Sequence, residues 1–268
     1  MQISTNYHTH CTFCDGKSAA EEMVNAALER GFTELGFSSH SMLPFSEPGT
    51  MDEPTARAYV GEIRRLADAY ADRIKIWCGI EADYLAGVTV PDRPYYASFG
   101  LDYLIGSIHY VGKVPVDHNP QLLADGIREH FGGDVGKFIR AYFAAEREMV
   151  SRYDFDIVGH PDLIRKFNQH HPYFDESAAW YREELQNTAE CIAASGKIVE
   201  INTGAIARGW LTEAYPSPYF LELLQSRNVP LLLSSDAHNA SAIDYGFDRY
   251  ASMATLDRLP TLPRPLRP

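Results

Sequence analysis

Seven short apolar runs alternate along this chain with segments of helical spacing, and this alternation constrains the fold more than any other feature. The runs lie at residues 3–7, 34–38, 74–80, 101–108, 155–158, 197–201 and 229–233. Strands that alternate with helices form parallel sheets joined by right-handed crossovers. No glycine-rich nucleotide-binding motif follows any run, so neither a dinucleotide site nor a P-loop is indicated. We expect one α/β domain built as a closed barrel.

Helices are expected between these strands, together with three irregular stretches. The helices are placed at residues 18–30, 54–70, 134–153, 176–195, 218–226 and about 243–256. Ser18 and Glu21 have capping-box spacing at the start of the first helix, and Gly31 follows its end. Residues 41–53, 88–98 and 111–133 are expected to be irregular, the second of them as a flap. Loops this long inside a compact domain are usually functional.

The first run ends in His8-Thr9-His10, with Asp15 close behind it. In an extended strand, side chains two apart point the same way, so both imidazoles would project from one strand end. Residues of the same kind end five further runs, at His40, Glu81, His109, His160 and the pair Asp236 and His238. In a βα barrel the active site lies where the strands end. These side chains are therefore expected to converge there.

Nine candidate ligands, those eight residues and Asp15, exceed the three or four protein ligands of a single catalytic zinc ion. Each has an ordinary alternative, because a lone histidine is more often a hydrogen-bonded core residue and Asp236 could cap a helix. Shared among three divalent ions, they leave positions for water and substrate. Zinc, iron or manganese would suit such ligands equally. The other histidines, His118, His130, His170 and His171, follow no strand and are not included.

Composition narrows the possible partners. The formal charge of −12 over 268 residues argues against binding a nucleic-acid backbone. No apolar run approaches the roughly 20 residues of a membrane span, and no signal peptide is evident, so a cytoplasmic enzyme without a membrane partner is the simplest interpretation. The oligomeric state is left open. Cys11 and Cys14 lack the second cysteine pair of a structural zinc site and are interpreted as small residues near the metal cluster.

A second class of metal hydrolase also begins with a His-x-His pair on the first strand of a barrel. The amidohydrolases, however, usually carry a bridging carboxylated lysine on the fourth strand. Residues 101–109 contain no lysine, and Glu81 ends the third strand instead. This difference argues against amide hydrolysis.

Together these motifs resemble the PHP (polymerase and histidinol phosphatase) superfamily. The matching segments follow the family's order across nearly the whole chain: His8-Thr9-His10, Asp15, Ser39-His40, Gly79-Ile80-Glu81, Ser107-Ile108-His109, Gly159-His160-Pro161 and Ser235-Asp236-Ala237-His238. Segments 81–84, 101–103 with 106–110, 160–164 and 200–203, like the chain length, resemble the monofunctional histidinol-phosphate phosphatases. Some members carry histidine at the position of Asp15, and either residue can bind a metal.

The resemblance implies a distorted (β/α)7 barrel spanning residues 1–268, with a loosely ordered tail from about residue 257, and a centre of three divalent metal ions. One ion would be held by His8, His10, Glu81 and Asp236. Glu81 would bridge to a second ion on His109 and His160, and Asp15, His40 and His238 would hold the third. The implied reaction is hydrolysis of L-histidinol phosphate in histidine biosynthesis, through attack on phosphorus by a metal-bridging hydroxide.

Contacts to this small phosphate ester are inferred from residues near the strand ends. Arg165 and Arg208 are candidates for the phosphate, with a surface salt bridge as the alternative. The acidic or aromatic partners for the amine and imidazole would be Asp83, Tyr84 and Tyr110. Asp236 or His238 would protonate the leaving alkoxide. Two other functions stay open: a phosphoesterase of the same family acting on a nucleotide or other phosphate ester, and a metal-binding module without activity.

Overall fold

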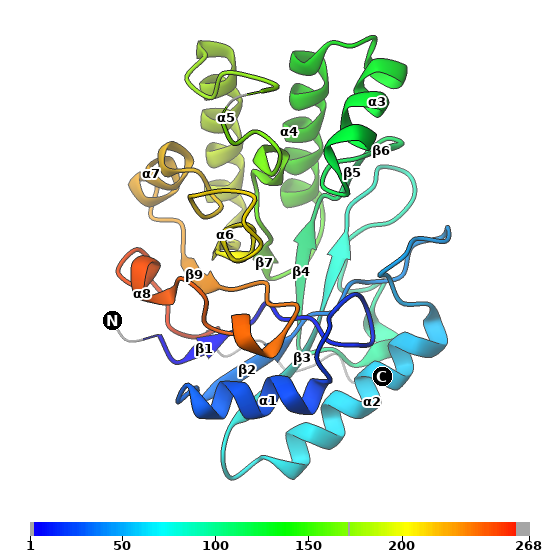
Figure 1. Ribbon diagram of the computed structural model, residues 1–268, viewed down its shortest axis with the longest axis vertical. Helices are drawn as coiled ribbons and strands as arrows, with labels where there is room; N and C mark the ends of the chain where they lie inside the picture. The colour runs from blue at the N-terminus through cyan, green and yellow to red at the C-terminus, as the bar shows by residue number, and fades with distance from the viewer. Residues whose placement is uncertain (1–2, 171, 261–268) are drawn as a thin grey trace.

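The computed structural model describes residues 3–170 and 172–260, and its centre is a sheet of seven parallel strands (Figure 1). The strands are β1 (Thr5–Asn6), β2 (Glu34–Phe37), β3 (Lys75–Asp83), β4 (Tyr103–Ser107), β7 (Ile157–Val158), β8 (Ile198–Asn202) and β9 (Leu231–Ser234). Their order in space follows their order in the chain. A parallel bridge between Thr9 and Ala237 nearly closes the sheet. The predicted barrel of seven parallel strands is confirmed.

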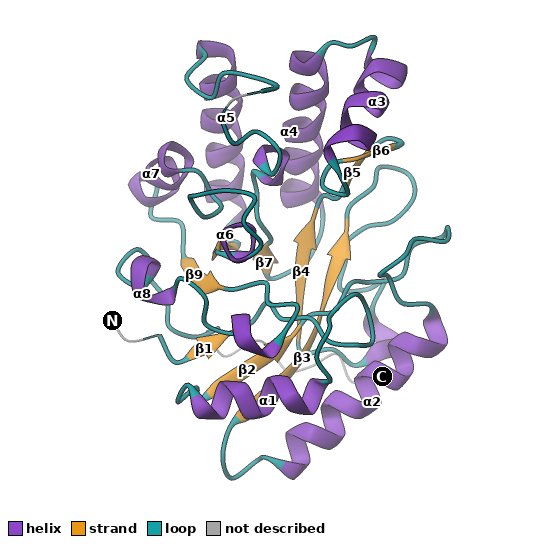
Figure 2. Ribbon diagram, viewed as in Figure 1, coloured by secondary structure: helices purple, strands orange, loops and turns teal. Residues whose placement is uncertain are grey.

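Helices separate most of the strands along the chain (Figure 2). They are α1 (Ala20–Glu29), α2 (Glu53–Ala69), α3 (Pro120–Phe131), α4 (Val135–Arg152), α5 (Ala179–Ser195), α6 (Gly204–Ala207), α7 (Pro218–Ser226) and α8 (Phe247–Tyr250). Helix α5 packs between α4 and α7, while α1 and α2 cover the side of the barrel formed by β2 and β3. Within the described residues, no helix is long and apolar enough to cross a membrane.

Large side chains fill the barrel interior behind the carboxyl ends of the strands. They are Tyr7, Tyr103, Ile105, Ile157, Ile198, Leu232 and Leu259. The Tyr103 ring occupies space that Gly79 leaves open, since a Cβ at Gly79 would approach the ring to 2.5 Å. The Tyr103 hydroxyl donates to the carbonyl of Tyr7, at 2.6 Å. These buried side chains together form a plug inside the barrel.

The tail that was expected to be loosely ordered begins as part of this plug. Leu259 is buried, and its backbone N–H donates to the hydroxyl of Tyr7 at 3.2 Å. Asp257 accepts a hydrogen bond of 3.0 Å from the backbone N–H of Ser4. The expectation is therefore wrong for residues 257–260, because a buried leucine and an aspartate tie them to the first strand. Residues 261–268 of the expected tail lie outside the described residues.

The segment 111–133, expected to be irregular, contains ordered structure. A hairpin of β5 (Tyr110–Val111) and β6 (Val114–Pro115) leads into α3. Asn119 caps α3 by accepting from the N–H of Leu122 at 2.9 Å, and Pro120 suits its first turn. Leu123 and Ile127 provide a buried stripe. The prediction of an irregular segment was wrong because the glycines and prolines around α3 are typical of loops and hide the signals for the start of the helix.

The segment 88–98, expected to form a flap, lies away from the barrel rim. Arg93 forms ion pairs with Asp154 and Asp156, which precede β7 at the opposite end of the sheet. The irregular segment 41–53, by contrast, does reach the site described below. The last predicted helix shrinks to α8, and Ser18 does not cap α1, because its hydroxyl instead accepts from the N–H of Ala240.

Candidate metal centre

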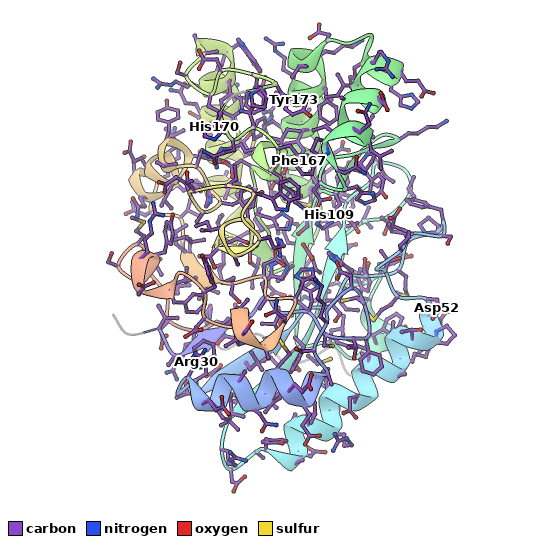
Figure 3. All side chains as sticks on the ribbon, in the orientation of Figure 1. Arg30, Asp52, His109, Phe167, His170 and Tyr173 are labelled. Atoms are coloured by element: carbon purple, nitrogen blue, oxygen red, sulfur yellow. The ribbon has the colours of Figure 1, made fainter. Side chains whose placement is uncertain are left out.

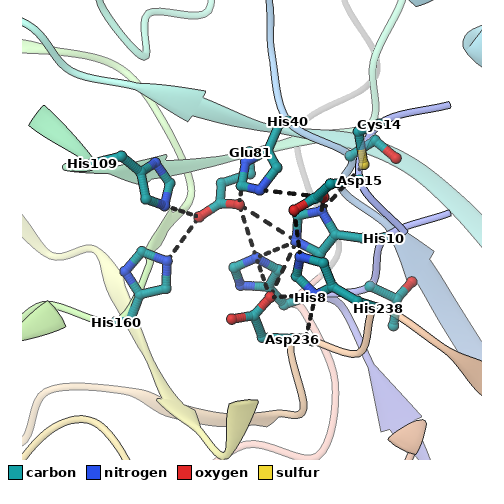
Figure 4. A network of polar contacts seen from close by, with 12 residues as sticks. His8, His10, Cys14, Asp15, His40, Glu81, His109, His160, Asp236 and His238 are labelled. Carbon is teal, nitrogen blue, oxygen red and sulfur yellow. Dashed lines mark hydrogen bonds and ion pairs between the residues drawn. The ribbon is translucent and has the colours of Figure 1, made fainter. Parts of the chain in front are cut away.

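The structure brings together all nine residues that the sequence suggested as metal ligands (Figure 4). They form four overlapping groups, each with ligand atoms within 4.8 Å of one another: His10, Asp15, His40 and His238; His8, His10 and Asp236; His8, Glu81 and His160; and His40, Glu81 and His109. Every group lies where barrel strands end. Overlap between the groups means that neighbouring ions would share ligands.

Glu81 stands at the centre of the cluster, and its two oxygens face different histidines. Oε1 lies 2.9 Å from Nε2 of His160 and 3.5 Å from Nε2 of His109. Oε2 lies 3.2 Å from Nε2 of His8 and 3.0 Å from Nδ1 of His40. Within the described residues, this buried Oε2 accepts no well-formed hydrogen bond. A carboxylate with one oxygen toward each set of imidazoles fits a bridging ligand between two cations.

Asp236 closes the cluster from the end of β9. Its Oδ1 lies 3.2 Å from Nε2 of His10 and 3.6 Å from Nε2 of His8. Its Oδ2 accepts from Nη2 of Arg208 at 2.9 Å. With a φ of 50°, Asp236 has a left-handed backbone conformation, which aspartate tolerates better than most residues. This local bend turns the carboxylate back across the barrel mouth.

The most exposed part of the cluster contains Asp15, whose side chain is 43% exposed. Its Oδ2 lies 3.2 Å from Nε2 of His238, and its Oδ1 lies 3.7 Å from Nε2 of His40. Gly49 covers this carboxylate closely, since a Cβ at Gly49 would come within 3.1 Å of the Asp15 side chain. The segment 41–53 therefore packs directly over this group.

Further carboxylates hold the histidine rings from behind. Nδ1 of His8 lies 2.9 Å from Glu200, and Nδ1 of His109 lies 2.6 Å from Asp83. Such partners fix the tautomer and leave Nε2 free for a metal. Glu200 was not among the residues predicted to form the site. Its signal was present, because a carboxylate inside the apolar run 197–201 must find a buried partner.

Electrostatics keep the central carboxylates ionised. Burial opposes the charged form of Glu81, yet His8 and His40 hold the pKa of its carboxyl well below its usual range. Burial likewise opposes charge on Asp236, and the Arg208 guanidinium more than compensates, so that this pKa is also well below normal. Both groups are thus anionic at neutral pH, as cation binding requires.

Two adjoining cavities open onto the cluster. The inner cavity, about 460 Å³ of empty space, is lined by the cluster together with Asp117, Leu163, Lys166 and Arg208. The outer cavity, about 680 Å³, runs on beneath residues 43–50 to Asp83, Tyr110 and His118. Lys166 and Asp117 line both cavities and form an ion pair of 2.9 Å. Figure 3 shows His109 near the middle of the molecule, where these cavities meet.

Two of the suggested substrate contacts lie elsewhere. Arg165 is buried, with its Nε donating to Glu176 at 2.7 Å, and it lines neither cavity. It belongs to a short 3-10 turn whose successive residues point in different directions, so its neighbour Lys166 is the one that reaches the cavities. Tyr84 points outside the barrel and packs on Tyr153, because side chains alternate along the strand. The predictions for Arg165 and Tyr84 are therefore wrong.

The other suggested contacts do line the cavities. Arg208 is in the inner cavity, and Asp83 and Tyr110 are in the outer one. Asp83 is already engaged by His109, and the Tyr110 hydroxyl donates to Glu47. Glu47, Asp117 and Lys166 were missed, since none of them follows one of the predicted strands, and only the folded structure brings them to the site.

A seven-stranded barrel with a polynuclear histidine and carboxylate cluster at its rim defines a metallohydrolase of the PHP type. The chain belongs to the PHP domain family, whose model matches residues 6–204. It is 29% identical over 273 residues to a protein of Schizosaccharomyces pombe named a probable histidinol-phosphatase, covering 96% of this chain and 87% of that protein.

Two solved structures share the fold. One is a histidinol phosphatase candidate of Listeria monocytogenes, with a TM-score of 0.81 and 23% identity over 92% of this chain and 99% of that chain. The other is the histidinol phosphate phosphatase of Lactococcus lactis, in complex with zinc, L-histidinol and phosphate. Its TM-score is 0.69, with 21% identity over 94% of this chain and 92% of that chain. At these identities the likeness establishes the barrel.

Proposed function

We propose that this chain is a metal-dependent phosphomonoesterase that hydrolyses L-histidinol phosphate to L-histidinol and phosphate. The observation that carries the proposal is the inner cavity, where the cluster meets two cationic side chains, Lys166 and Arg208. A phosphoryl group is the anion that such a site suits best. Relatives named histidinol-phosphatase, aligned over most of the chain, support the substrate.

The donor set fits divalent metal ions, because it combines buried imidazoles with a central carboxylate that has an oxygen free. We infer three ions, which share the nine residues of the four groups in the way that the family resemblance implies. His8, His10, Glu81 and Asp236 would hold one, Glu81, His109 and His160 a second, and Asp15, His40 and His238 the third. When bound, such ions lower the pKa of water and neutralise phosphate oxygens.

The protein's own groups would orient the phosphate. Arg208 is held by Asp236 at 2.9 Å, which fixes its guanidinium at the cluster. Lys166 approaches from the side of Asp117. Water attacks phosphorus on the side opposite the ester oxygen. A new P–O bond forms and the P–O bond to the ester oxygen breaks, so the leaving alkoxide must gain a proton. Because Arg208 keeps Asp236 ionised, this carboxylate is poorly suited to donate that proton.

The outer cavity suits the cationic end of the substrate. Its wall carries Glu47, Asp83 and Asp117. Asp83 also contacts His109, and Asp117 also forms an ion pair with Lys166. Glu47 lies against Tyr110 and 3.6 Å from Nε2 of His118. An ammonium beside Asp117 and an imidazole against Glu47 would complement these charges. A nucleoside monophosphate, whose nucleoside carries no positive charge, would not.

Assay of the metal-loaded protein against a panel of phosphate esters tests this proposal. We expect turnover of L-histidinol phosphate to exceed that of nucleoside monophosphates and uncharged aryl phosphates. Faster hydrolysis of nucleotides would replace the proposed substrate with the alternative family activity. Release of no phosphate from any ester would favour a metal-binding module instead.

A further inference from the structure

The loop that follows β1 brings a thiol against a histidine of the cluster (Figure 4). Sγ of Cys14 lies 3.4 Å from Nδ1 of His10. The same sulfur lies 3.5 Å from the backbone carbonyl of Cys11. Cys14 is half-buried, whereas His10 has no exposed surface. This contact links the CxxC pair to the cluster, a role that the spacing of the cysteines alone does not reveal.

The two distances define a consistent chain of donors and acceptors. A thiol can accept one hydrogen bond and donate another. In the tautomer of His10 that has its proton on Nδ1, this N–H would donate to Sγ, while the S–H donates to the carbonyl of Cys11. The remaining ring nitrogen then carries a lone pair, and it points into the cluster, 3.2 Å from Oδ1 of Asp236. The other polar group facing Nδ1 is Asp15, whose Oδ1 is too distant at 3.9 Å.

We propose that Cys14 is a positioning residue, whose thiol holds the His10 ring in the tautomer and orientation that present Nε2 to a metal ion. The inference rests on the proposed ligand role of His10. Cys14 itself falls in none of the four ligand groups found among the described residues. It therefore acts through His10 and not as a ligand.

The chemistry of the partner distinguishes His10 from its neighbours. His8 and His109 are held by the carboxylates of Glu200 and Asp83, which add negative charge to the site. A neutral thiol satisfies the same N–H without a further charge. It is also a weak acceptor, so it fixes the ring while raising its basicity less than a carboxylate does.

Zinc affinity of three variants tests the inference without relying on activity. The metal is removed with a chelator, and zinc is returned in competition with a chromogenic chelator. We expect Cys14→Ala, which lacks both hydrogen bonds, to bind zinc about 10- to 100-fold more weakly, the range for loss of such a partner. Cys14→Ser keeps a donor and an acceptor and should lose less than about tenfold. Cys11→Ala removes the other thiol of the loop, whose sulfur contacts the Ser39 hydroxyl and not the His10 ring, and it should match the wild type.

Several results would overturn the inference. Equal zinc affinity in Cys14→Ala and the wild type would contradict the positioning role of Cys14. Equal losses of zinc affinity in Cys11→Ala and Cys14→Ala would also contradict it, because they would indicate an effect of loop packing. Thermal unfolding of the metal-free variants excludes general misfolding as the cause. A sulfur-to-cobalt charge-transfer band in the cobalt-loaded wild type, absent from Cys14→Ser, would show that Cys14 is a ligand.

A parallel measurement on His10→Ala separates this inference from the proposed metal centre. Loss of a metal equivalent in His10→Ala together with normal affinity in Cys14→Ala would reject the positioning role alone. Full metal content in His10→Ala would reject the ligand assignment on which the inference rests. Loss in both variants, with rescue by Cys14→Ser, supports both.

Discussion

Oδ1 of Asp83 lies 2.6 Å from Nδ1 of His109, and this contact turns the other ring nitrogen toward Glu81, 3.5 Å away. Glu81 and Asp83 stand two residues apart on β3, on the same face of the strand. One strand thus supplies both the central carboxylate and the group that orients a neighbouring ligand. Burial lowers the pKa of His109, but Asp83 and Glu81 raise it overall, to about 9.

Asp83→Asn should weaken metal binding or turnover by about 10- to 100-fold, as loss of an orienting carboxylate usually does. The asparagine can present an N–H to Nδ1 and so favours the wrong tautomer of His109. Metal content by elemental analysis and kcat for L-histidinol phosphate would measure the effect. If only KM changed, Asp83 would be a substrate contact, as the sequence had suggested.

Glu81→Gln should release at least one metal equivalent and lower kcat by more than the roughly 100-fold expected for an outer partner. A neutral amide offers one oxygen in place of the two that now face separate histidines. Elemental analysis after gel filtration is the direct measurement. Unchanged metal content would contradict the bridging role.

Arg208→Ala should raise KM for L-histidinol phosphate by about 10- to 100-fold, the equivalent of one charge-assisted hydrogen bond. Arg165→Ala is the matched control, because Arg165 is buried against Glu176 and lines neither cavity. It should affect stability and leave KM unchanged. An unaltered KM in Arg208→Ala would remove this residue from the phosphate site.

Glu47→Gln tests the outer cavity. We expect KM for L-histidinol phosphate to rise by about tenfold or more, since a charged partner is lost, while KM for phenyl phosphate stays constant. Comparison of the two substrates isolates recognition of the cationic end. Parallel changes for both substrates would instead indicate that segment 41–53 had shifted as a whole.

Replacement of Glu146 on α4 should increase the stability of the protein in a pH-dependent way. It is fully buried, and neither carboxylate oxygen has a hydrogen-bond partner within the described residues. Burial, and then Asp162, raise the pKa of this carboxyl well above its usual value. A raised pKa of an acid costs nothing below the unfolded-state pKa of about 4.3 and destabilises the fold increasingly above it.

Glu146→Gln should therefore be more stable than the wild type by about 1–3 kcal/mol at pH 8, and equally stable near pH 4. Urea unfolding of the metal-free proteins at both pH values would measure the difference. A gain of the same size at both values would show that the carboxyl does not ionise in this range.

Much of the barrel could be predicted because its signals are local. Each apolar run is long enough to indicate a strand, and polar residues at six strand ends mark the rim of a parallel barrel. His8 and His10 reveal their shared direction through their spacing alone. Helix α3 was not predicted, because its capping residue Asn119 lies among turn-forming residues that are typical of a loop.

The substrate side was harder because its residues come from loops and turns. The sequence Arg165-Lys166 does not show which of the two cations faces the cavities. The 3-10 turn at Leu163–Arg165 places Lys166 there. Cys14 and Glu200 each contact a histidine, and only the folded distances show which histidine each one contacts.

Asp257 and Leu259 contact the first strand at positions 253 and 252 residues away in the sequence. The direction in which His8 and His10 project therefore depends on residues that bind no metal and line neither cavity. Substitutions at Asp257 or Leu259 should accordingly loosen the metal centre from behind, without removing any of its ligands.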